Sequence, residues 1–267
     1  MTFDMTKELT ARLDLAVTVA REAGDITLAH FRGEALAVEL KQDASPVTIA
    51  DRRAEEHLRS RIAAAFPADG VLGEEFGERV GTSGFRWILD PIDGTKSFVA
   101  GVPLYGELVA VEHEGRAVVG VIHIPAMDEM VYAARGQGAW HRVGAGERRP
   151  AKVSTKARLD ESLFLTTDPK TFTVIGRRDA YEALEQACKL ARTWGDCYGY
   201  LMVATGRAEV MVDPKMHVWD CAALQPVLEE AGGTFTDWRG TPTIHAEEAV
   251  ATNGLVRDEV LRILASR

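Results

Sequence analysis

The chain has 267 residues, of which 46% are hydrophobic and 27% charged, enough for a full core in one large domain or in two fused sub-domains. Its formal net charge of −9 argues against nucleic acid as the main partner, but bound divalent cations could still offset this charge around a phosphorylated small molecule. The sequence contains no apolar run of about 18 residues, so we expect no membrane span. Residues 1–8 lack the apolar core of a signal peptide. The three cysteines have no metal-binding spacing and fit a reducing cytoplasm.

Two helices are expected at the beginning of the chain. Apolar residues at helical spacing predict a long amphipathic helix over residues 9–31. A polar loop with a proline follows at 41–48, and Thr48 is placed to cap a second helix from 49 to about 66. Asp51 lies in the first turn of that helix, where the simplest interpretation is that it complements the helix dipole.

The central stretch of the sequence is a strand followed by acids. Residues 85–89 are aromatic and aliphatic, which indicates a short buried strand. We expect pairing to stop at Asp90, because Pro91 cannot donate a ladder hydrogen bond. The Asp-Gly pair at 93–94 favours a turn whose following N–H groups would point at an anion. Such a place suits hard cations and a phosphate, although an ordinary turn with solvated acids remains the alternative.

Two further acidic segments accompany this stretch. Glu74 follows the apolar pair at 71–72, so we expect it to lie just past the end of another strand. Asp220 opens a helix that runs to about 232, lies on its apolar stripe, and needs a partner that a metal would supply. Pro226 should kink this helix mildly. Four acids could converge as an oxygen-only cluster that suits magnesium or calcium rather than zinc: Glu74, Asp90, Asp93 and Asp220.

The remaining segments divide the chain into two halves. Alternating or apolar segments predict antiparallel strands at 105–112, 117–124 and 130–134. Glycine pairs at 136–138 and 144–146 lack the third glycine of a dinucleotide site. Residues 148–150 are interpreted as a solvated loop and as the boundary between halves of about 1–150 and 151–267.

The second half alternates strands and helices, which is α/β order. Its expected elements are a strand near 162–166, helices at about 179–190 and 198–205, a strand at 208–212, the Asp220 helix, a strand at 234–236 and a helix at 256–265. We expect residues 1–267 to form a single domain.

Three motifs occur in order: Gly-Glu-Glu at 73–75, Asp-Pro-Ile-Asp-Gly-Thr at 90–95, and Trp-Asp-Cys-Ala at 219–222. With them the chain resembles, over nearly its whole length, the inositol monophosphatase family of magnesium-dependent phosphatases. The resemblance implies a layered α/β (α+β) fold, an αβαβα sandwich with an N-terminal antiparallel-sheet half and a C-terminal α/β half. It also implies two or three Mg²⁺ per active site and a homodimer.

The resemblance further implies roles for individual residues. The metal ligands would be Glu74, Asp90, the carbonyl of Ile92, Asp93 and Asp220. The catalytic residues would be Glu74 and Thr95, which orient the attacking water, and Asp51, which holds Thr95. The substrate would contact Gly94, Thr95, Lys96, Arg192, Asp196, Asp213 and Asp220. Glu75 is expected to support this set rather than to ligate.

Other reaction types can be compared with the sequence. A cysteine phosphatase needs Cys-x₅-Arg, but the residues six after the three cysteines are Trp194, Val203 and Val227. A haloacid dehalogenase-type phosphatase needs Asp-x-Asp, whereas this chain has two intervening residues, one of them proline. Metal-assisted hydrolysis without a covalent intermediate remains. A silent small-molecule binder on the same fold would be expected to lack Glu74 or Thr95, and both are present.

The choice of substrate depends on residues 192–200. Their Trp-Gly-Asp-Cys-Tyr-Gly-Tyr run resembles the histidinol-phosphatase branch of the family. Carboxylates at Asp196 and Asp213 suit a cationic substrate, and histidinol phosphate carries an ammonium and a titratable imidazole. Two alternatives stay open: Asp196 could be the N-cap of the helix that begins near Tyr198, and inositol-1-phosphate could be the substrate.

Overall fold

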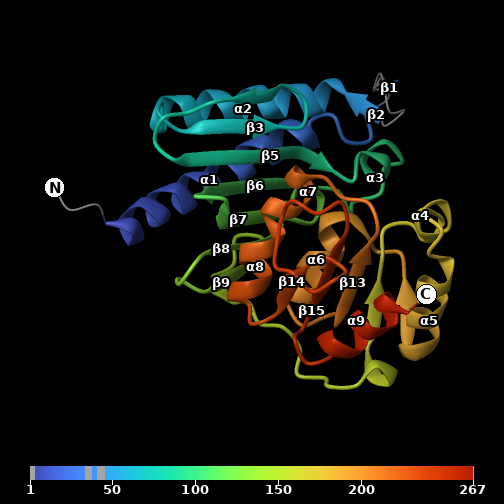
Figure 1. Ribbon diagram of the computed structural model, residues 1–267. Helices are drawn as coiled ribbons and strands as arrows, with labels where there is room; N and C mark the ends of the chain where they lie inside the picture. The colour runs from blue at the N-terminus through green and yellow to red at the C-terminus, as the bar shows by residue number, and fades with distance from the viewer. Residues whose placement is uncertain (1–3, 34–37, 41–45, 267) are drawn as a thin grey trace.

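The computed structural model describes residues 4–33, 38–40 and 46–266, so most of the polar loop expected at 41–48 lies outside the described residues. The fold has five layers (Figure 1): a pair of helices, a large sheet, central helices, a smaller sheet and an outer group of helices. This arrangement confirms the αβαβα sandwich expected from the sequence.

The first layer contains two helices: α1 (Met5–Leu28) and α2 (Ile49–Ala65). Helix α1 buries a stripe of small and aliphatic residues, among them Leu9, Ala16 and Ala20, against the large sheet. Thr48 caps α2 as predicted, and its hydroxyl accepts a hydrogen bond from the backbone N–H of Ala50 at 3.1 Å. A short pair of strands precedes α2: β1 (Val38–Leu40) and β2 (Pro46–Thr48).

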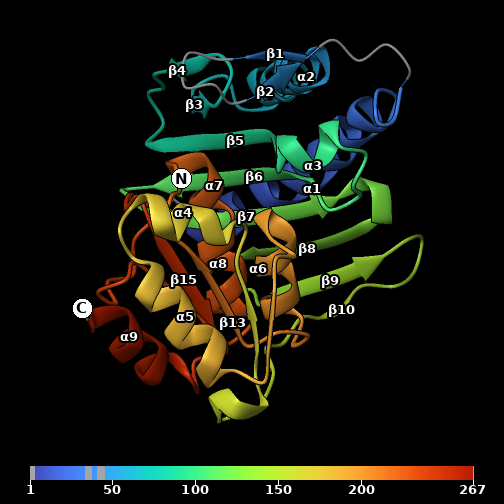
Figure 2. The same cartoon turned by 90° about the vertical axis from the view of Figure 1, so that its right-hand side faces the viewer.

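The large sheet has eight strands, and Figure 2 shows β5 to β9 lying in sequence order across it. From one edge to the other they are β10 (Arg149–Pro150), β9 (Ala139–Val143), β8 (Glu129–Ala134), β7 (Arg116–Ile124), β6 (Gly106–His113), β5 (Phe85–Asp93), β3 (Gly70–Gly73) and β4 (Gly77–Arg79). All neighbours are antiparallel except β3 and β5, so the expected meander is confirmed. Residues 149–150 form an edge strand rather than a solvated loop, and an edge tolerates the missing N–H of Pro150.

Strand β5 is longer than predicted. It runs to Asp93 rather than ending at Asp90, and Asp93 pairs with Gly106 of β6. The register shifts between Asp90 and Asp93, because Pro91 interrupts the ladder without ending the strand. The short helix α3 (Thr95–Val99) follows directly.

The second half contains the smaller sheet and the remaining helices. The sheet order is β12 (Leu190–Arg192), β11 (Leu163–Leu165), β13 (Val210–Asp213), β15 (Ala249–Thr252) and β14 (Thr234–Thr236). The central helices are α6 (Asp196–Ala204), α7 (Val218–Ala222) and α8 (Leu224–Glu230). The outer helices are α4 (Pro169–Val174), α5 (Arg178–Ala187) and α9 (Arg257–Ala265).

Two expectations for this half need correction. The helix expected at 179–190 ends at Ala187, and Leu190 already belongs to β12. The Asp220 helix is not mildly kinked but divided into α7 and α8 at Ala223. A proline ring conflicts with the carbonyl four residues earlier, which for Pro226 is that of Ala222, where α7 ends.

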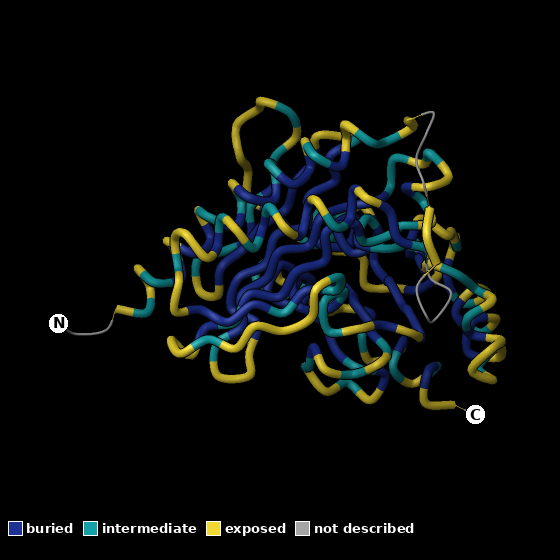
Figure 3. The backbone as a smooth tube through the Cα atoms, turned by 90° about the horizontal axis from the view of Figure 1, so that it is seen from above, coloured by how far each residue is buried: buried dark blue, intermediate teal, exposed yellow. Residues whose placement is uncertain are grey.

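Apolar cores fill the spaces between the layers. One core lies between α1, α2 and the large sheet, a second lies between the two sheets around α6, α7 and α8, and a third lies under α4, α5 and α9. Figure 3 shows the buried strands at the centre and the exposed segments at the periphery. Among the described residues, no helix is long and apolar enough to cross a membrane.

Candidate active site

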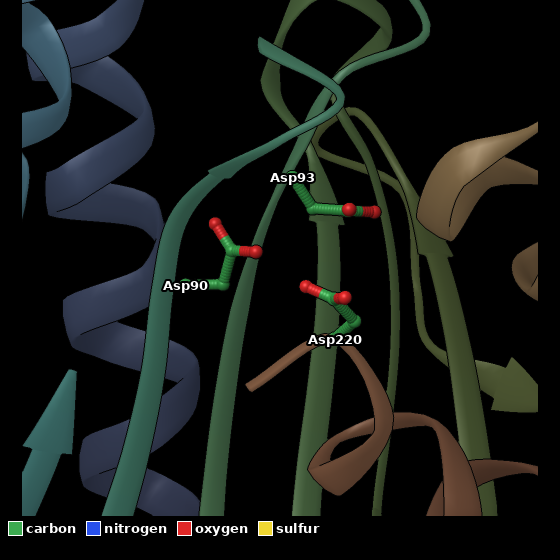
Figure 4. A group of neighbouring side chains, drawn as sticks. All are labelled: Asp90, Asp93 and Asp220. Atoms are coloured by element: carbon green, nitrogen blue, oxygen red, sulfur yellow. The ribbon is translucent and has the colours of Figure 1, made fainter. Parts of the chain in front are cut away.

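Three aspartates meet where β5 ends and α7 begins. Figure 4 shows the side chains of Asp90, Asp93 and Asp220 pointing toward one another, and each contributes a carboxylate oxygen within 4.8 Å of the others. The bulge in β5 turns both of its acids toward α7. Asp220 is fixed by its position in the first turn, where its carboxylate accepts a hydrogen bond from the backbone N–H of His217 at 2.7 Å.

The three carboxylates perturb one another. Burial, followed by repulsion from Glu74, Asp93 and Asp220, raises the pKa of Asp90 well above its ordinary value. Burial and the neighbouring Asp196 and Asp220 do the same to the pKa of Asp93. Burial raises the pKa of Asp220 to about 7. Among the described residues, no basic side chain is hydrogen-bonded to these three carboxylates, and such an oxygen-only set fits a hard divalent cation such as Mg²⁺.

Glu74 lies beside this cluster on the turn between β3 and β4. It shares a hydrogen bond with Asp90. The turn is held from α2 by the buried Glu55, whose carboxylate accepts hydrogen bonds from the backbone N–H groups of Glu75 at 2.8 Å and Phe76 at 3.2 Å. A Cβ on Gly73 would lie 2.0 Å from Glu55 Oε1, so only glycine fits there. The sequence analysis missed Glu55, although an acid one turn after Asp51 on the buried side of the helix was a usable signal.

Asp51 and Thr95 have separate partners, contrary to the expectation that Asp51 holds Thr95. The carboxylate of Asp51 accepts hydrogen bonds from the backbone N–H of Thr48 at 2.8 Å and from its hydroxyl at 2.6 Å. The hydroxyl of Thr95 donates to the carbonyl of Ile92 at 3.0 Å. Both hydrogen bonds end on Oδ2 of Asp51, and they close the first turn of α2. The Ile92 carbonyl keeps one lone pair for another ligand.

Gly94 has a left-handed backbone with φ of 82°. A Cβ there would lie 2.8 Å from Asp196 Oδ2, so the turn and the substrate end of the site are in contact. This explains why the Asp-Gly pair predicted the turn correctly.

A cavity of about 180 Å³ opens beside the three aspartates. Its lining comes from both halves of the chain: Asp93, Lys96, Thr167, Asp168, Thr171, Asp196, Tyr200, Asp213, Pro214, Lys215, Met216, Asp220 and Leu224. Lys96, Asp196 and Asp213 were expected at the substrate, and all three line the cavity. Arg192 does not: it is exposed on β12 and donates a hydrogen bond to the carbonyl of Ala191 at 2.6 Å. The expectation that Arg192 contacts the substrate therefore finds no support in the geometry.

Asp196 does not cap its helix. Gly195 occupies the N-cap position and Asp196 is the first helical residue, with a positive φ of 51° and no side-chain capping bond. Its carboxylate instead accepts a hydrogen bond from the hydroxyl of Ser97 at 3.3 Å. Burial, followed by repulsion from Asp213, raises the pKa of Asp196 to about 7. The next backbone N–H, that of Cys197, donates to the carboxylate of Asp93.

Asp213 is buried and accepts four hydrogen bonds. The hydroxyls of Thr166, Thr167 and Tyr200 donate at 3.2, 3.0 and 3.1 Å, and the backbone N–H of Thr167 donates at 2.8 Å. Burial still raises the pKa of Asp213, although these donors lower it in part. The sequence analysis missed Thr167, because its partners lie far along the chain and no local pattern marks it.

The chain is similar to known proteins over nearly its whole length. A histidinol-phosphatase of Chlorobaculum parvum is 44% identical over 257 residues, covering 96% of this chain and 97% of the relative. A histidinol-phosphatase of Mycobacterium tuberculosis is 39% identical, covering 93% and 96%. The structure of extragenic suppressor protein suhB from Bartonella henselae has a TM-score of 0.89 at 30% identity, covering 96% of this chain and 99% of that one. The sequence model of the inositol monophosphatase family matches residues 8–266, and the chain therefore belongs to the inositol monophosphatase family.

Proposed function

We propose that the protein is a Mg²⁺-dependent phosphomonoesterase that hydrolyses histidinol phosphate to histidinol and phosphate, a step of histidine biosynthesis. The observation that carries the proposal is the convergence of Asp90, Asp93 and Asp220 beside a small cavity lined with acids. The names of the two relatives, which are 44% and 39% identical over nearly the whole chain, support the choice of substrate.

Two or three Mg²⁺ would be held by the carboxylates of Glu74, Asp90, Asp93 and Asp220 and by the carbonyl of Ile92. When bound, these ions would supply polarisation of the phosphoryl oxygens and a more acidic water. The chain itself contributes position. Asp90 is fixed by a hydrogen bond from the backbone N–H of Ile92 at 3.1 Å, and Asp220 by the N–H of His217. Each carboxylate is therefore oriented in advance, and no side-chain reorganisation is required during the reaction.

The phosphate end of the substrate would lie against the turn after β5. The backbone N–H groups of Gly94 and Thr95 would donate to phosphate oxygens, and Lys96, which lines the cavity, would offset phosphate charge. Thr95 and Glu74 would orient the attacking water. Asp51 would contribute by fixing the start of α2 beside Glu74, through the hydrogen bonds that its Oδ2 accepts from Thr48.

The other end of the substrate would lie near Asp196 and Asp213. Burial raises the pKa of both carboxylates, and Asp213 raises that of Asp196 further, so the pair favours a ligand with a positive charge. Histidinol phosphate provides an ammonium and an imidazole, whereas inositol-1-phosphate provides only hydroxyls. This difference favours the first substrate over the second.

We also propose that residues 1–267 act as one domain, as a homodimer in the cytoplasm. The family model spans both halves, and the cavity takes its lining from each. The three cysteines are buried and free, which fits a reducing compartment.

The proposal is tested by phosphate release from a panel of esters, with and without Mg²⁺. The panel contains histidinol phosphate, inositol-1-phosphate, fructose-1,6-bisphosphate and adenosine 3′,5′-bisphosphate. We expect Mg²⁺-dependent release with the highest kcat/KM on histidinol phosphate. A higher kcat/KM on inositol-1-phosphate would make that ester the preferred substrate in place of histidinol phosphate. No phosphate release from any ester would favour a silent binder.

A further inference from the structure

Thr167 bridges the two acids at the substrate end of the cavity. It follows β11 by two residues and lines the cavity itself. Its hydroxyl donates to Oδ2 of Asp213 at 3.0 Å and accepts from the backbone N–H of Asp196 at 2.9 Å. Its own backbone N–H donates to Oδ1 of Asp213 at 2.8 Å. One hydroxyl therefore connects an acid on β13 with an acid at the start of α6.

The segment that carries Asp196 is held in an unusual conformation against Thr167. Asp196 has a φ of 51°, in the left-handed region that non-glycine residues seldom occupy. Such a conformation persists only where the surroundings impose it. Gly195 supplies one such constraint, because a Cβ there would lie 2.2 Å from Thr167 Cα. The hydrogen bond to the Asp196 N–H supplies another.

The charge of the cavity shows which ligand this arrangement favours. Five aspartates and two lysines line it. Asp93 and Asp220 lie toward the metal centre, and Asp168 lies at the start of α4. The other two acids, Asp196 and Asp213, have no basic side chain among their hydrogen-bond partners in the described part of the chain. Lys96 lowers the pKa of Asp196 in part, but burial and Asp213 still raise it. A cationic group on the ligand would complement these two carboxylates.

We propose that Thr167 is a positioning residue that holds Asp196 and Asp213 in the arrangement that selects phosphate monoesters with a cationic group. The inference rests on the proposed phosphatase function and names the class of ester that the site prefers. Threonine meets the requirement because a hydroxyl can donate one hydrogen bond and accept another at the same time. Serine keeps both abilities, and valine has the same shape but neither ability.

The test compares Thr167→Val with Thr167→Ser and with Thr166→Val. The last variant is a matched control, because the Thr166 hydroxyl donates to Asp213 at 3.2 Å but has no bond to Asp196. We expect Thr167→Val to raise KM for histidinol phosphate roughly ten- to hundredfold, the range for a hydrogen bond to a charged group, with a much smaller change in kcat. Thr167→Ser should restore most of the affinity, and Thr166→Val should lose clearly less.

Two further measurements separate a positioning role from general damage. Thr167→Val should keep the rise in melting temperature that Mg²⁺ produces in the wild type. In the double variant with Asp196→Asn, the fold-loss of kcat/KM on histidinol phosphate should be much smaller than the product of the two single losses. Both changes act on the same substrate contact. If Thr167→Val does not fold, Thr167→Ala removes the same hydroxyl and carries the same expectations.

A second pair of esters distinguishes this inference from the proposed function. O-Phosphoethanolamine carries an ammonium and glycerol 2-phosphate does not. Reduced preference for the cationic ester in Thr167→Val supports the positioning role even if the wild type does not act on histidinol phosphate. Equal losses on both esters, or equal effects of Thr166→Val and Thr167→Val, would overturn it. No Mg²⁺-dependent phosphate release from any ester would overturn both claims.

Discussion

Two buried aspartates lie at opposite ends of the neighbouring parallel strands β3 and β5, and each is 1% exposed. Asp69, just before β3, accepts hydrogen bonds from Nε and Nη2 of Arg12, both at 2.9 Å, from the Ser83 hydroxyl at 2.6 Å and from the Trp87 indole at 2.9 Å. The Arg12 guanidinium lies over the Phe85 ring at 3.6 Å. This acid is fully compensated within the chain.

Asp90, at the other end, is surrounded by acids. Glu74, Asp93 and Asp220 all raise its pKa, and its carboxylate accepts a hydrogen bond from the backbone N–H of Ile92. Asp69 and Asp90 are equally buried aspartates. The charge of Asp69 is neutralised by groups of the chain itself, whereas Asp90 has an acidic environment that an external cation could neutralise. The difference indicates that Asp69 serves stability, and it supports the proposal that Asp90 binds a metal ion.

The largest effect is expected for Asp90→Asn. This change removes one ligand charge from the cluster, and turnover should fall by roughly 10²–10³-fold or more, the cost of removing one electrostatic stabiliser from an active site. The free energy of unfolding without metal should not fall, because repulsion among the carboxylates is reduced. Steady-state kinetics and chemical denaturation of one preparation measure both. Near-normal turnover at saturating Mg²⁺ would refute the role of Asp90.

Asp69→Asn should show the reverse pattern. It leaves the buried Arg12 short of a counter-charge, which should lower the free energy of unfolding by about 3 kcal/mol. Turnover per folded molecule should change little. Glu8→Gln is the matched control, since Glu8 contacts the same arginine at 2.6 Å but is 40% exposed and should cost less than about 1 kcal/mol. Equal stability of Asp69→Asn and the wild type would remove the contrast.

An effect of intermediate size is expected for Glu55→Gln. Glu55 holds the turn that carries Glu74, so the change should weaken Mg²⁺ binding about tenfold, as loss of a residue that orients a ligand does. Isothermal titration with Mg²⁺ measures this directly. Glu56→Gln, one residue along the helix and exposed, should bind as the wild type does. If Glu55→Gln bound Mg²⁺ as tightly as the wild type, Glu55 would have a structural role only and would not orient Glu74.

The smallest effect is expected for Arg192→Ala. Arg192 is exposed and bonds to its neighbour's carbonyl, so kcat/KM on histidinol phosphate should change less than about twofold, as for a surface substitution. Lys96→Ala, in the cavity lining, should lower the same ratio clearly more. A tenfold loss in Arg192→Ala would restore Arg192 to the substrate site.

The sequence predicted those parts of the molecule whose signal is local. The periodic apolar residues of α1 and α9, the cap at Thr48 and the turn at Gly94 were readable, because neighbouring residues determine each of them. The convergence of Asp90, Asp93 and Asp220 was also predicted, since the motifs lie at strand and helix ends. Short strands such as β12 and β15 carry too few residues for a pattern.

Other features depend on contacts that no local pattern records. Glu55 acts on a turn 20 residues away, and Thr167 joins acids 29 and 46 residues away. The alternative that Asp196 is the N-cap of its helix was wrong, because sequence rules do not foresee a positive φ at an aspartate. Asp51 was expected to hold Thr95, but its Oδ2 accepts hydrogen bonds from the nearer donors of Thr48.

In this account a divalent cation completes the acid cluster. The effect of the cation on the stability of the fold should then depend on pH in one direction. The pKa of Asp220 is raised from 3.8 to about 7, so the contribution of this carboxyl group to the stability of the metal-free fold is greatest at low pH and is lost as the pH rises toward and through about 7. Mg²⁺ competes with these protons and should stabilise the fold more at pH 8 than at pH 5.

The most direct measurement is thermal unfolding of the wild type and of Asp90→Asn at pH 5 and pH 8, with and without Mg²⁺. At a concentration about 100 times the Kd, Mg²⁺ should raise the wild-type melting temperature at pH 8 by about 5–10 °C, with a smaller rise at pH 5. Asp90→Asn should show little response at either pH. An equal response to Mg²⁺ in both proteins, or in the wild type at both pH values, would contradict a metal site at this cluster.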